Sequence, residues 1–309
     1  MKILVTGGAG FIASHIVDAY INLGHDVVIV DNLSSGRREF INKKAKFYQA
    51  DIRDRDKIKD IFTKERPEVL NHHAAQISVR ESVLDPINDA EINILGLLNL
   101  LEAGRKNGVK KIIFASSGGV VYGEAKQIPT HEDYNPLQPL SPYGVSKLAS
   151  EYYLNFYYTT YGIQYFALRY SNVYGPRQNP HGEAGVVAIF SLKLLNGEIP
   201  IINGDGKQTR DYVYVGDVVE ANKIALTSSE GGVFNIGTGI ETNVLEIYQN
   251  IKEITGNSVS AKHGPAKSGE QKRSCLDSRL AAEKLDWKAK INLDEGLKKT
   301  IEYFKSHYY

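Results

Sequence analysis

The sequence predicts an α/β fold in which a doubly wound parallel sheet is followed by a smaller C-terminal α/β region. Short apolar runs rich in β-branched residues, typical of buried parallel strands, alternate with helical patterns over the first 175 residues. Beyond Gly175 the segments become shorter and turns more frequent. We therefore expect a first domain over residues 1–175 and a smaller one over residues 176–309, interleaved with the first and joined to it without a flexible linker.

The first predicted strand, Lys2–Thr6, is followed by a glycine-rich turn and by a helical pattern that ends near Gly24. Gly8, Gly10 and Ala13 match the G-x-G-x-x-G/A fingerprint of a Rossmann dinucleotide-binding fold. The glycines of that motif let the backbone approach a pyrophosphate, which binds at the N-terminus of the following helix. A strand before the motif and a helical pattern after it therefore indicate a dinucleotide site.

The second predicted strand, residues 26–30, ends at Asp31, about twenty residues beyond the glycines. A carboxylate at this position can accept hydrogen bonds from the adenosine ribose hydroxyls and would repel a 2′-phosphate. Arg37 and Arg38 follow closely and could favour a 2′-phosphate, but we expect both of them in a solvated loop. The pattern therefore predicts NAD rather than NADP as the cofactor.

The later elements continue the alternation of strands and helices. Strands are predicted at residues 46–50, 68–71, 111–116 and 163–170, and helices at residues 54–65, 85–106, 143–161 and 184–195. Ligands of such sheets bind beyond the carboxyl ends of the strands. The residues singled out at those ends are Gly8, Asp31, Asp51, Ala74, Ser117 and Asn172. Asn93 lies inside the predicted helix 85–106, where the pattern does not separate a surface position from a functional one.

Tyr143 and Lys147 are four residues apart at the start of a predicted helix, so their side chains lie on one helical face. A positive neighbour favours the phenolate form of a tyrosine. We therefore expect the Tyr143 phenol to give up its proton more easily than a free tyrosine. The pair could then serve as a general base for an alcohol.

The same Tyr-x-x-x-Lys spacing also occurs at Tyr122/Lys126 and at Tyr248/Lys252. Tyr122 lies in a glycine-rich stretch just after a strand. Tyr248 lies in the middle of an amphipathic pattern, where a tyrosine is more often part of the core. Tyr143 alone begins a helix, after a strand that ends in a pair of serines. We therefore choose Tyr143 as the candidate base.

Composition excludes several classes of partner. The net charge is +1 without a block of like charges, which indicates no nucleic-acid partner, and no apolar run has the length of a membrane span. The single cysteine, Cys275, excludes an internal disulfide framework and fits a reducing compartment. The adjacent His72 and His73 lack the spacing of metal ligands. We expect a cytoplasmic protein that binds no nucleic acid, membrane or metal.

Two groups of side chains remain. Aromatic residues recur along the predicted helix 143–161, and we expect them in the core and in a contact between subunits. Basic residues of the C-terminal region that could contact a phosphorylated ligand are Arg210, Lys267, Lys272 and Arg273. For each of these four, a solvated surface cation is the favoured interpretation.

Taken together, these residues resemble the extended short-chain dehydrogenase/reductase family, and within it the UDP-glucose (UDP-galactose) 4-epimerases. The resemblance spans nearly the whole chain and includes Thr6–Ile12, Asp31–Gly36, Asp51-Ile52, His73–Ala75, Asn93 with Gly96, Ser116–Gly123, Tyr143/Lys147, Arg169–Pro176 and Gly204–Asp217. It implies NAD-dependent epimerisation at C4 of a UDP-hexose through a 4-keto intermediate. It also implies a homodimer in contact through the helices of residues 85–106 and 141–161.

The resemblance also assigns site residues. It implies that Tyr143 is the base, that Lys147 holds the nicotinamide ribose and that Ser117 is the third catalytic residue. The implied cofactor-binding residues are Gly7, Gly10, Phe11, Ile12, Asp31, Asn32, Ser34, Ser35, Gly36, Asp51, Ile52, His73, Ala74, Ala75, Asn93, Ser116, Tyr143, Lys147 and Tyr170. The implied substrate-binding residues are Ser117, Tyr143, Asn172, Val186, Arg210, Lys267 and Glu270.

The sequence departs from the family pattern at three positions. Gly118 stands where relatives have a serine or threonine that hydrogen-bonds the reacting hydroxyl, so Ser117 or a water could take over this role. Ala13 replaces the third glycine of the fingerprint, and its methyl group should be tolerated. Lys267 stands where many relatives have an arginine. The guanidinium of an arginine can bind a phosphate through two hydrogen bonds, whereas the ammonium of a lysine acts as a point charge.

Other activities stay open. A 4,6-dehydratase of this family needs an Asp-Glu pair where Gly119 and Val120 stand, so we rank it below epimerisation. A decarboxylase and a 4-epimerase of UDP-uronic acids or UDP-N-acetylhexosamines are harder to exclude, and the small Ser274 is compatible with an N-acetyl group. A rival of another class is a non-catalytic dinucleotide sensor, although such proteins often lose the Tyr/Lys pair that is present here.

Overall fold

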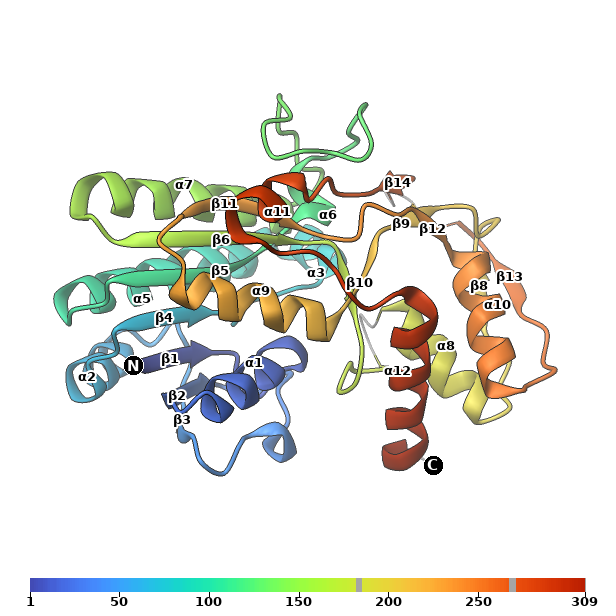
Figure 1. Ribbon diagram of the computed structural model, residues 1–309, viewed down its shortest axis with the longest axis horizontal. Helices are drawn as coiled ribbons and strands as arrows, with labels where there is room; N and C mark the ends of the chain where they lie inside the picture. Colours follow the sequence, from blue (N-terminus) through green and yellow to red (C-terminus); the bar gives the residue numbers. More distant parts are fainter. Residues whose placement is uncertain (182–184, 267–270, 309) are drawn as a thin grey trace.

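The computed structural model describes residues 1–181, 185–266 and 271–308 (Figure 1). Its largest part is a parallel sheet of seven strands with helices on both faces, which confirms the predicted doubly wound α/β class. The strands follow the order β11-β6-β5-β4-β1-β2-β3 across the sheet. Their bounds are β1 Lys2–Thr6, β2 Asp26–Asp31, β3 Lys46–Gln49, β4 Val69–His72, β5 Lys111–Ser117, β6 Gln164–Tyr170 and β11 Gly232–Ile236.

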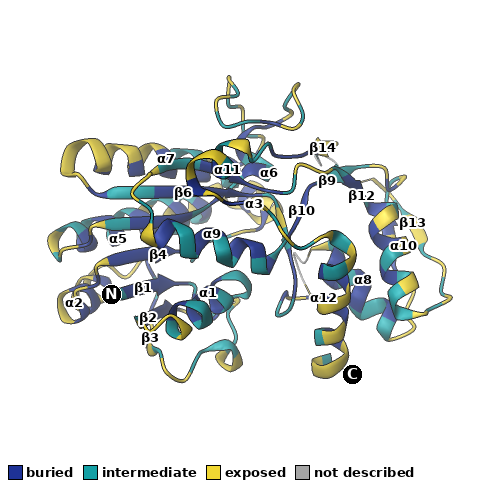
Figure 2. Ribbon diagram, viewed as in Figure 1, coloured by how far each residue is buried: buried dark blue, intermediate teal, exposed yellow. Residues whose placement is uncertain are grey.

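Both faces of the sheet are buried under helices (Figure 2). The helices are α1 Phe11–Asn22 and α9 Val215–Thr227 on one face, and α2 Arg55–Glu65, α5 Gly96–Lys106 and α7 Pro142–Tyr161 on the other. Successive side chains of a strand point to opposite faces, so Ile3 and Val5 of β1 pack with α1 and α9. Leu4, between them, packs with α2, α5 and α7.

The order of the strands reverses at β1. This strand pairs with β2 on one side and with β4 on the other, and Leu4 lies opposite both Val28 and Leu70. The chain therefore leaves the centre of the sheet in opposite directions after β1 and after β4. A crevice opens at the carboxyl ends of strands at such a reversal, and ligands of doubly wound sheets bind there.

The C-terminal part of the chain lies beside these carboxyl ends (Figure 1). Its helices α8 Val186–Leu195, α10 Val244–Thr255 and α12 Leu293–Tyr308 pack around a separate core that contains Phe190, Ile247 and Ile301. Its short strands pair as β7 Asn172–Tyr174 with β10 Tyr212–Tyr214, as β8 Ile201–Asn203 with β13 Lys262–Gly264, and as β9 Thr209–Arg210 with β12 Thr242–Asn243 and β14 Arg273–Ser274.

Short helices complete the described structure. They are η1 Arg38–Phe40, α3 Val79–Leu84, α4 Pro86–Ala90, η2 Glu91–Leu95, α6 Gly118–Val121 and α11 Arg279–Leu285. No helix among the described residues is long and apolar enough to cross a membrane.

Two of the differences between the structure and the predicted elements concern the sheet and the helix that contains Asn93. The sheet gains a seventh strand, β11, from the C-terminal half of the chain, where it pairs with β6 and Phe234 lies opposite Leu168. The single helix predicted over residues 85–106 consists of α4, the π-helical turn η2 and α5. The π-helical turn contains Asn93, whose side chain is buried and bonds the loop after β4 rather than solvent.

Candidate functional site

A cavity of about 1290 Å³ lies at the crevice where the order of strands reverses. Most of the residues expected at the site line it together. They are Gly7, Gly10, Phe11, Ile12, Asp31, Asn32, Ser34, Ser35, Asp51, Ile52, His73, Ala74, Ala75, Ser116, Ser117, Tyr143, Lys147, Tyr170, Asn172 and Arg210. Residues far apart in the sequence therefore meet in one space: most follow strands that end at the same edge of the sheet, and Asn172 and Arg210 come from short strands beyond it.

Among the described residues, three expected ones are not in the wall of the cavity: Gly36, Asn93 and Val186. A Cβ atom at Gly36 would lie 2.9 Å from Oδ1 of Asp31, so this glycine lets the loop pass close to that carboxylate. Val186 begins α8 and packs, partly buried, against the C-terminal core. Lys267 and Glu270 lie outside the described residues.

The Asn93 side chain holds the backbone of a residue that lines the cavity. Its Oδ1 accepts a hydrogen bond from the backbone N–H of Gln76 at 3.0 Å, and its Nδ2 donates to the backbone carbonyl of Gln76, also at 3.0 Å. Gln76 lines the cavity directly after Ala74 and Ala75. The structure therefore gives Asn93 a role in holding the loop that faces the cofactor, and not a direct contact with the cavity.

The turn after β1 has the geometry of a pyrophosphate site. Gly7 has a φ of +70°, and a Cβ atom there would lie 2.8 Å from the backbone nitrogen of Ala74, so only glycine fits between the two loops. Helix α1 begins at Phe11 after Gly10, which has no side chain that could cap the first turn. The N–H groups in the first turn of α1, and the positive end of its helix dipole, are therefore available to an anion at the cavity wall.

Asp31 occupies the position expected for ribose recognition. It is 7% exposed, and its carboxylate accepts hydrogen bonds from the backbone N–H groups of Ala9 at 3.0 Å and Leu33 at 2.8 Å. The neighbouring cations are engaged elsewhere: Arg37 pairs with Glu39, and Arg38 donates to Gln49. A carboxylate without a cation directed at a 2′-phosphate fits NAD, as the sequence predicts.

Helix α7 presents the Tyr–Lys pair. Ser141 caps its N-terminus by accepting a hydrogen bond from the Gly144 N–H at 3.2 Å, and Pro142 occupies the first turn. Lys147 is 4% exposed and donates to the carbonyl of Ala115 at 2.8 Å, which fixes its ammonium beside the end of β5. The Lys147 Nζ lies 5.7 Å from the centre of the Tyr143 ring.

Burial shifts both groups of this pair away from their charged forms. It raises the pKa of Tyr143 well above 10, and the negative charge of Asp89 raises it further. It lowers the pKa of Lys147 to about 8, against the opposing effect of Asp89 and Glu151. The expectation that the Tyr143 phenol loses its proton more easily than a free tyrosine is therefore wrong for the protein alone, because burial and the charge of Asp89 both raise its pKa. A base at Tyr143 needs additional positive charge near its oxygen.

The two other Tyr-x-x-x-Lys matches have structural roles. Tyr122 is 3% exposed, donates to Oδ1 of Asn235 at 2.8 Å and accepts from Nη1 of Arg169 at 2.8 Å. Tyr248 is 4% exposed and donates to the carbonyl of Val259 at 2.7 Å. Neither is among the described residues that line the cavity, so the structure supports the choice of Tyr143.

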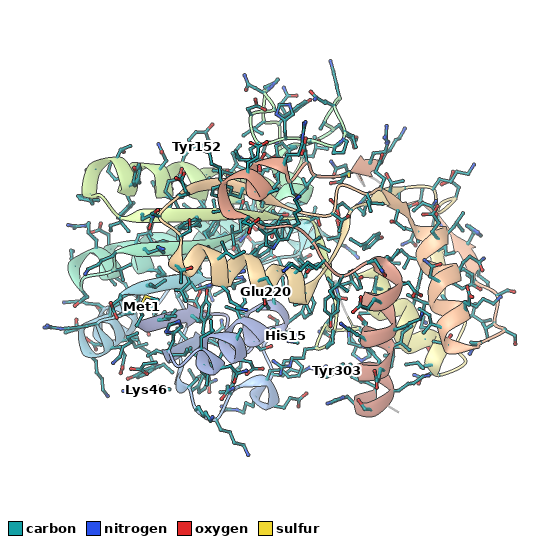
Figure 3. All side chains as sticks on the ribbon, viewed as in Figure 1. Met1, His15, Lys46, Tyr152, Glu220 and Tyr303 are labelled. Carbon is teal, nitrogen blue, oxygen red and sulfur yellow. The ribbon has the colours of Figure 1, made fainter. Side chains whose placement is uncertain are left out.

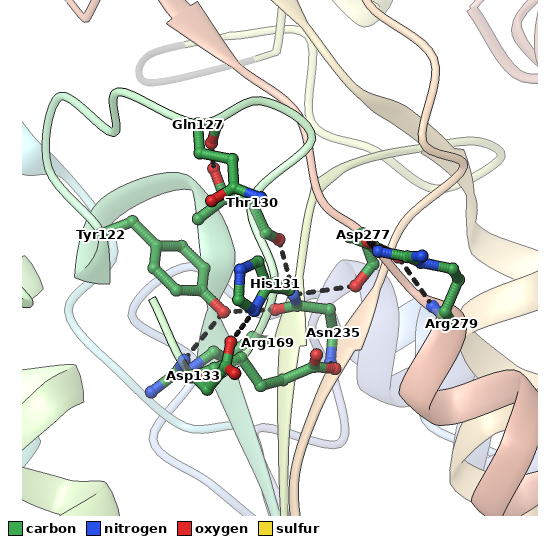
Figure 4. A network of polar contacts seen from close by, with 10 residues as sticks. Tyr122, Gln127, Thr130, His131, Asp133, Arg169, Asn235, Asp277 and Arg279 are labelled. Atoms are coloured by element: carbon green, nitrogen blue, oxygen red, sulfur yellow. Dashed lines mark hydrogen bonds and ion pairs between the residues drawn. The ribbon is translucent and has the colours of Figure 1, made fainter. Parts of the chain in front are cut away.

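A buried polar network joins β5, β6 and α7 beside the cavity, and part of it is drawn in Figure 4. Arg169 of β6 binds both carboxylate oxygens of Glu151 on α7, at 2.9 and 2.6 Å, and Ser116 donates to the same carboxylate at 2.5 Å. Figure 4 shows that Arg169 donates a hydrogen bond to the hydroxyl of Tyr122, which in turn donates to Asn235. The network connects β5, β6 and α7, and so fixes the helix that carries Tyr143 and Lys147 relative to the sheet.

Ser117, rather than Gly118, faces the cavity. A Cβ atom at Gly118 would lie 2.5 Å from Cδ1 of Leu276, so a serine or threonine could not stand there unless Leu276 moved. Ser117 ends β5 between the buried Ser116 and the short helix α6. This geometry agrees with Ser117 as the residue that replaces the family hydroxyl.

Ser117→Ala is expected to lower kcat about ten- to a hundredfold, the scale of one positioned hydrogen-bonding group near the reacting oxygen. Substrate affinity should change little, because the hydroxyl would act mainly on the reacting alcohol. Steady-state kinetics with the UDP-hexose that the family resemblance implies measures both quantities. An unchanged kcat would assign the role to a water molecule.

Sequence reasoning missed the wall formed by Gln76 and helix α3, of which Val79, Arg80, Val83 and Leu84 line the cavity. A local signal was present, since Ser78 and Glu81 have the S-x-x-E spacing of a helix start. Ser78 indeed accepts a hydrogen bond from the Glu81 N–H at 2.9 Å. Over the described ranges, no group of three or more His, Cys, Asp or Glu side chains could hold a metal ion.

The fold and the cavity together define a Rossmann-type dinucleotide-binding enzyme with a Tyr–Lys pair. Residues 3–237 match the model of the NAD dependent epimerase/dehydratase family, and the chain belongs to this family. This membership confirms the resemblance to extended short-chain dehydrogenases and identifies NAD as the cofactor of the family.

Individual relatives match over the full length of the chain. The UDP-glucose 4-epimerase of Mycolicibacterium smegmatis is 46% identical over 312 residues, which cover 99% of each chain. The crystal structure of UDP-glucose 4-epimerase from Thermotoga maritima with UDP-glucose is 51% identical, with a TM-score of 0.98 over 100% of both chains. The UDP-glucose 4-epimerase of Thermus thermophilus, in complex with NAD, is 44% identical with a TM-score of 0.94, covering 99% of this chain and 100% of that one.

Proposed function

We propose that the protein catalyses the NAD-dependent epimerisation of UDP-galactose and UDP-glucose at C4. The observation that carries this proposal is the position of Tyr143 and Lys147 in the same cavity as the glycine turn after β1 and Asp31. A base for a hydroxyl therefore lies in the same cavity as the predicted dinucleotide site. Relatives that are 44–51% identical over the whole chain and are named UDP-glucose 4-epimerases support the same activity.

The residues divide the work of such a reaction. The Tyr143 oxygen takes the proton of the sugar 4-hydroxyl and returns it after the 4-ketose has turned over in the cavity. Lys147 keeps a positive charge beside the phenol and would also hold the nicotinamide ribose. Bound NAD supplies reversible hydride transfer at C4. The first turn of α1 and Asp31 would hold its pyrophosphate and its adenosine ribose.

Residues from the far side of the cavity would hold the nucleotide of the substrate. Asn172 begins β7, and Arg210 ends β9, so both reach the cavity from elements beyond the main sheet. Arg210 donates to the carbonyl of Thr209 at 2.8 Å, which fixes the direction of its guanidinium. An arginine and an amide at this edge suit the phosphates and ribose of a UDP-sugar. Lys267 and Glu270 remain proposed contacts outside the described residues.

A direct assay tests the proposal. Purified protein, without added NAD, should convert UDP-galactose to UDP-glucose, because the cofactor would be regenerated in every cycle and stay bound. If protein with NAD bound turns over none of a panel of UDP-sugars, the chain is a non-catalytic dinucleotide-binding protein. Turnover of UDP-glucuronate or formation of a 4-keto-6-deoxy product would identify one of the alternative reactions.

UDP-N-acetylhexosamines are a second candidate substrate class. Ser274 is buried in β14 and pairs with Arg210 of β9, which lines the cavity, while Ser274 itself lies behind that wall. Space at this position would accommodate an N-acetyl group. Turnover of UDP-N-acetylglucosamine at less than roughly a thousandth of the UDP-galactose rate would count against this extension, since differences that large require a site that rejects the group.

We further propose a homodimer formed through α4, η2 and α7. An apolar stripe on these adjoining helices is exposed: Ile87 is 71% exposed, Leu95 54%, Val145 51%, Tyr152 67% and Phe156 47%. Figure 3 shows Tyr152 on the side of α7 away from the sheet. Two such stripes could bury each other in a four-helix contact.

We also propose a cytoplasmic location, which agrees with the buried free thiol of Cys275.

Tyr152→Glu combined with Leu95→Glu is expected to convert a dimer into monomers, because paired carboxylates would be buried without partners in the contact. Size-exclusion chromatography with light scattering should give twice the 34.3 kDa chain mass for the wild type and the chain mass for the variant. Tyr158→Glu is the control, since Tyr158 is also exposed on α7 but packs against Tyr165 of the same chain. A monomeric wild type would contradict the proposed contact.

A further inference from the structure

Asp89 is a fully buried carboxylate behind the Tyr–Lys pair, with a relative exposure of 0%. It lies on α4, which packs against α7. Its Oδ2 accepts a hydrogen bond from the hydroxyl of Ser146 at 2.6 Å. Its Oδ1 accepts from Nε2 of Gln76 and from Nδ2 of Asn93, each at 3.0 Å.

These partners connect the base to the wall of the cofactor cavity. Ser146 directly precedes Lys147 and follows Tyr143 by three residues, so the Asp89 carboxylate holds the turn of α7 that carries both groups. Gln76 lines the cavity, and Asn93 brackets its backbone from behind. A single carboxylate therefore joins the catalytic turn to the loop that faces the cofactor.

The charge of Asp89 also reaches the pair. Glu151, the other carboxylate that acts on Lys147, is bound at both oxygens by the guanidinium of Arg169. The donors to Asp89 are uncharged side chains, so its charge is not neutralised in the same way. Its negative charge raises the pKa of Lys147, against burial, and also raises the pKa of Tyr143. Lys147 is thus the cation on which Asp89 acts.

Other charged or titratable groups face this pair from the neighbouring elements. His72 at the end of β4 and His73 directly after it approach Lys147, but burial lowers the pKa of both imidazoles far below neutrality, so they carry no charge in the working range. Arg80 and Glu81 of α3 and Glu91 of η2 are exposed to solvent, which screens their charges. Asp89 is therefore the buried carboxylate near this pair whose hydrogen-bond donors are uncharged side chains.

We propose that Asp89 is a positioning residue that holds the Tyr143–Lys147 turn through Ser146 and sets the pH range in which this pair transfers protons. This inference rests on the proposed function, since it concerns the base of that reaction. Removing the charge while keeping the shape, as in Asp89→Asn, makes deprotonation of both Tyr143 and Lys147 easier. The acidic limb and the alkaline limb of the pH profile should then move in the same direction, toward lower pH.

The experiment compares two variants. In Asp89→Asn, the kcat/KM profile for UDP-galactose should move to lower pH on both limbs, and a displacement of about one pH unit would change the rate on either limb about tenfold. In Ser146→Ala, which removes the hydrogen bond but keeps the carboxylate, kcat should fall without a shift of the profile. A purely structural role predicts the same unshifted loss in both variants. That result, or an equal shift in Ser146→Ala, would overturn the proposal.

A second measurement does not depend on turnover. Competitive acetylation with mass spectrometry gives the reactivity of the Lys147 amine, which increases with its neutral fraction. Lys147 should react faster at pH 7 in Asp89→Asn than in the wild type, and equal reactivity would refute the electrostatic role of Asp89. If the wild type shows no epimerase activity, the proposed function fails while this comparison still tests Asp89. Thermal unfolding checks each variant, and Asp89→Ser is the replacement if Asp89→Asn does not fold.

Discussion

Tyr143→Phe is expected to lower kcat for UDP-galactose by roughly a hundred- to ten-thousandfold, the range that a positioned general base contributes. The substitution removes one oxygen and leaves the ring, so the cavity keeps its shape. UDP-sugar affinity should change little, because Asn172 and Arg210 bind the other end of the ligand in the proposed complex. Steady-state kinetics gives the loss in kcat, and titration calorimetry with UDP-glucose gives the affinity.

Tyr248→Phe is the matched control for this prediction. It makes the same chemical change in a second Tyr-x-x-x-Lys match, where the hydroxyl donates to the carbonyl of Val259 in the C-terminal core. The same hydroxyl also accepts a hydrogen bond from the backbone N–H of Ala261 at 3.0 Å. We expect the loss of these two hydrogen bonds to cost about 1–3 kcal/mol of stability and to leave kcat near the wild-type value. If Tyr143→Phe retained kcat within a fewfold of the wild type, Tyr143 would not be the base.

The sheet was predictable because its signals are local. Most of the first six strands are short apolar runs that end in a polar or small residue. The predicted ends agree with the structure within one or two residues, as at Lys46–Gln49. The alternation with helices leads directly to a parallel sheet. The dinucleotide turn was predictable for the same reason, since Gly7, Gly10 and Asp31 are spaced by the geometry of one βαβ unit.

The seventh strand was not predictable in this way. Its place beside β6 depends on pairing between positions 166–170 and 232–236 of the chain. Helix α9 likewise covers the sheet next to α1, although about two hundred residues separate them. No local pattern contains such long-range pairing. The predicted order of elements is therefore more secure than the predicted division of the chain into two parts.

In the candidate site, too, some features follow from local sequence patterns and others depend on tertiary contacts. The Tyr143–Lys147 pair follows from spacing and from its place at a helix start, whereas the direction in which the pKa of each group shifts depends on burial. The positions of Asp89 and of the wall at α3 likewise depend on tertiary contacts. In the sequence, Asp89 looks like any other acidic residue in the first turn of a helix. Desolvation and buried charges therefore have to be taken from the structure.

Arg169→Met is expected to lower the free energy of unfolding by about 3–5 kcal/mol, the usual loss when one partner of a buried ion pair is removed. The side chains of Arg169 and Glu151 are only 4% and 6% exposed, so the Glu151 carboxylate would stay buried without its cation. Tyr122 would also lose the donor at its hydroxyl. Urea denaturation, with an unchanged dependence on urea concentration, measures this loss.

The double variant Arg169→Met/Glu151→Leu separates the ion pair from the loss of packing. With both charges removed, no uncompensated carboxylate remains, and the double variant should be more stable than Arg169→Met alone. Recovery will be incomplete, because Ser116 and Tyr122 each lose a hydrogen-bond partner in the double variant. A loss below about 1 kcal/mol in Arg169→Met would mean that water reaches Glu151, and that the network does not fix α7 against the sheet. A large loss that Glu151→Leu partly reverses would show that the helix carrying Tyr143 and Lys147 is held by a charge pair that is costly to break from one side only.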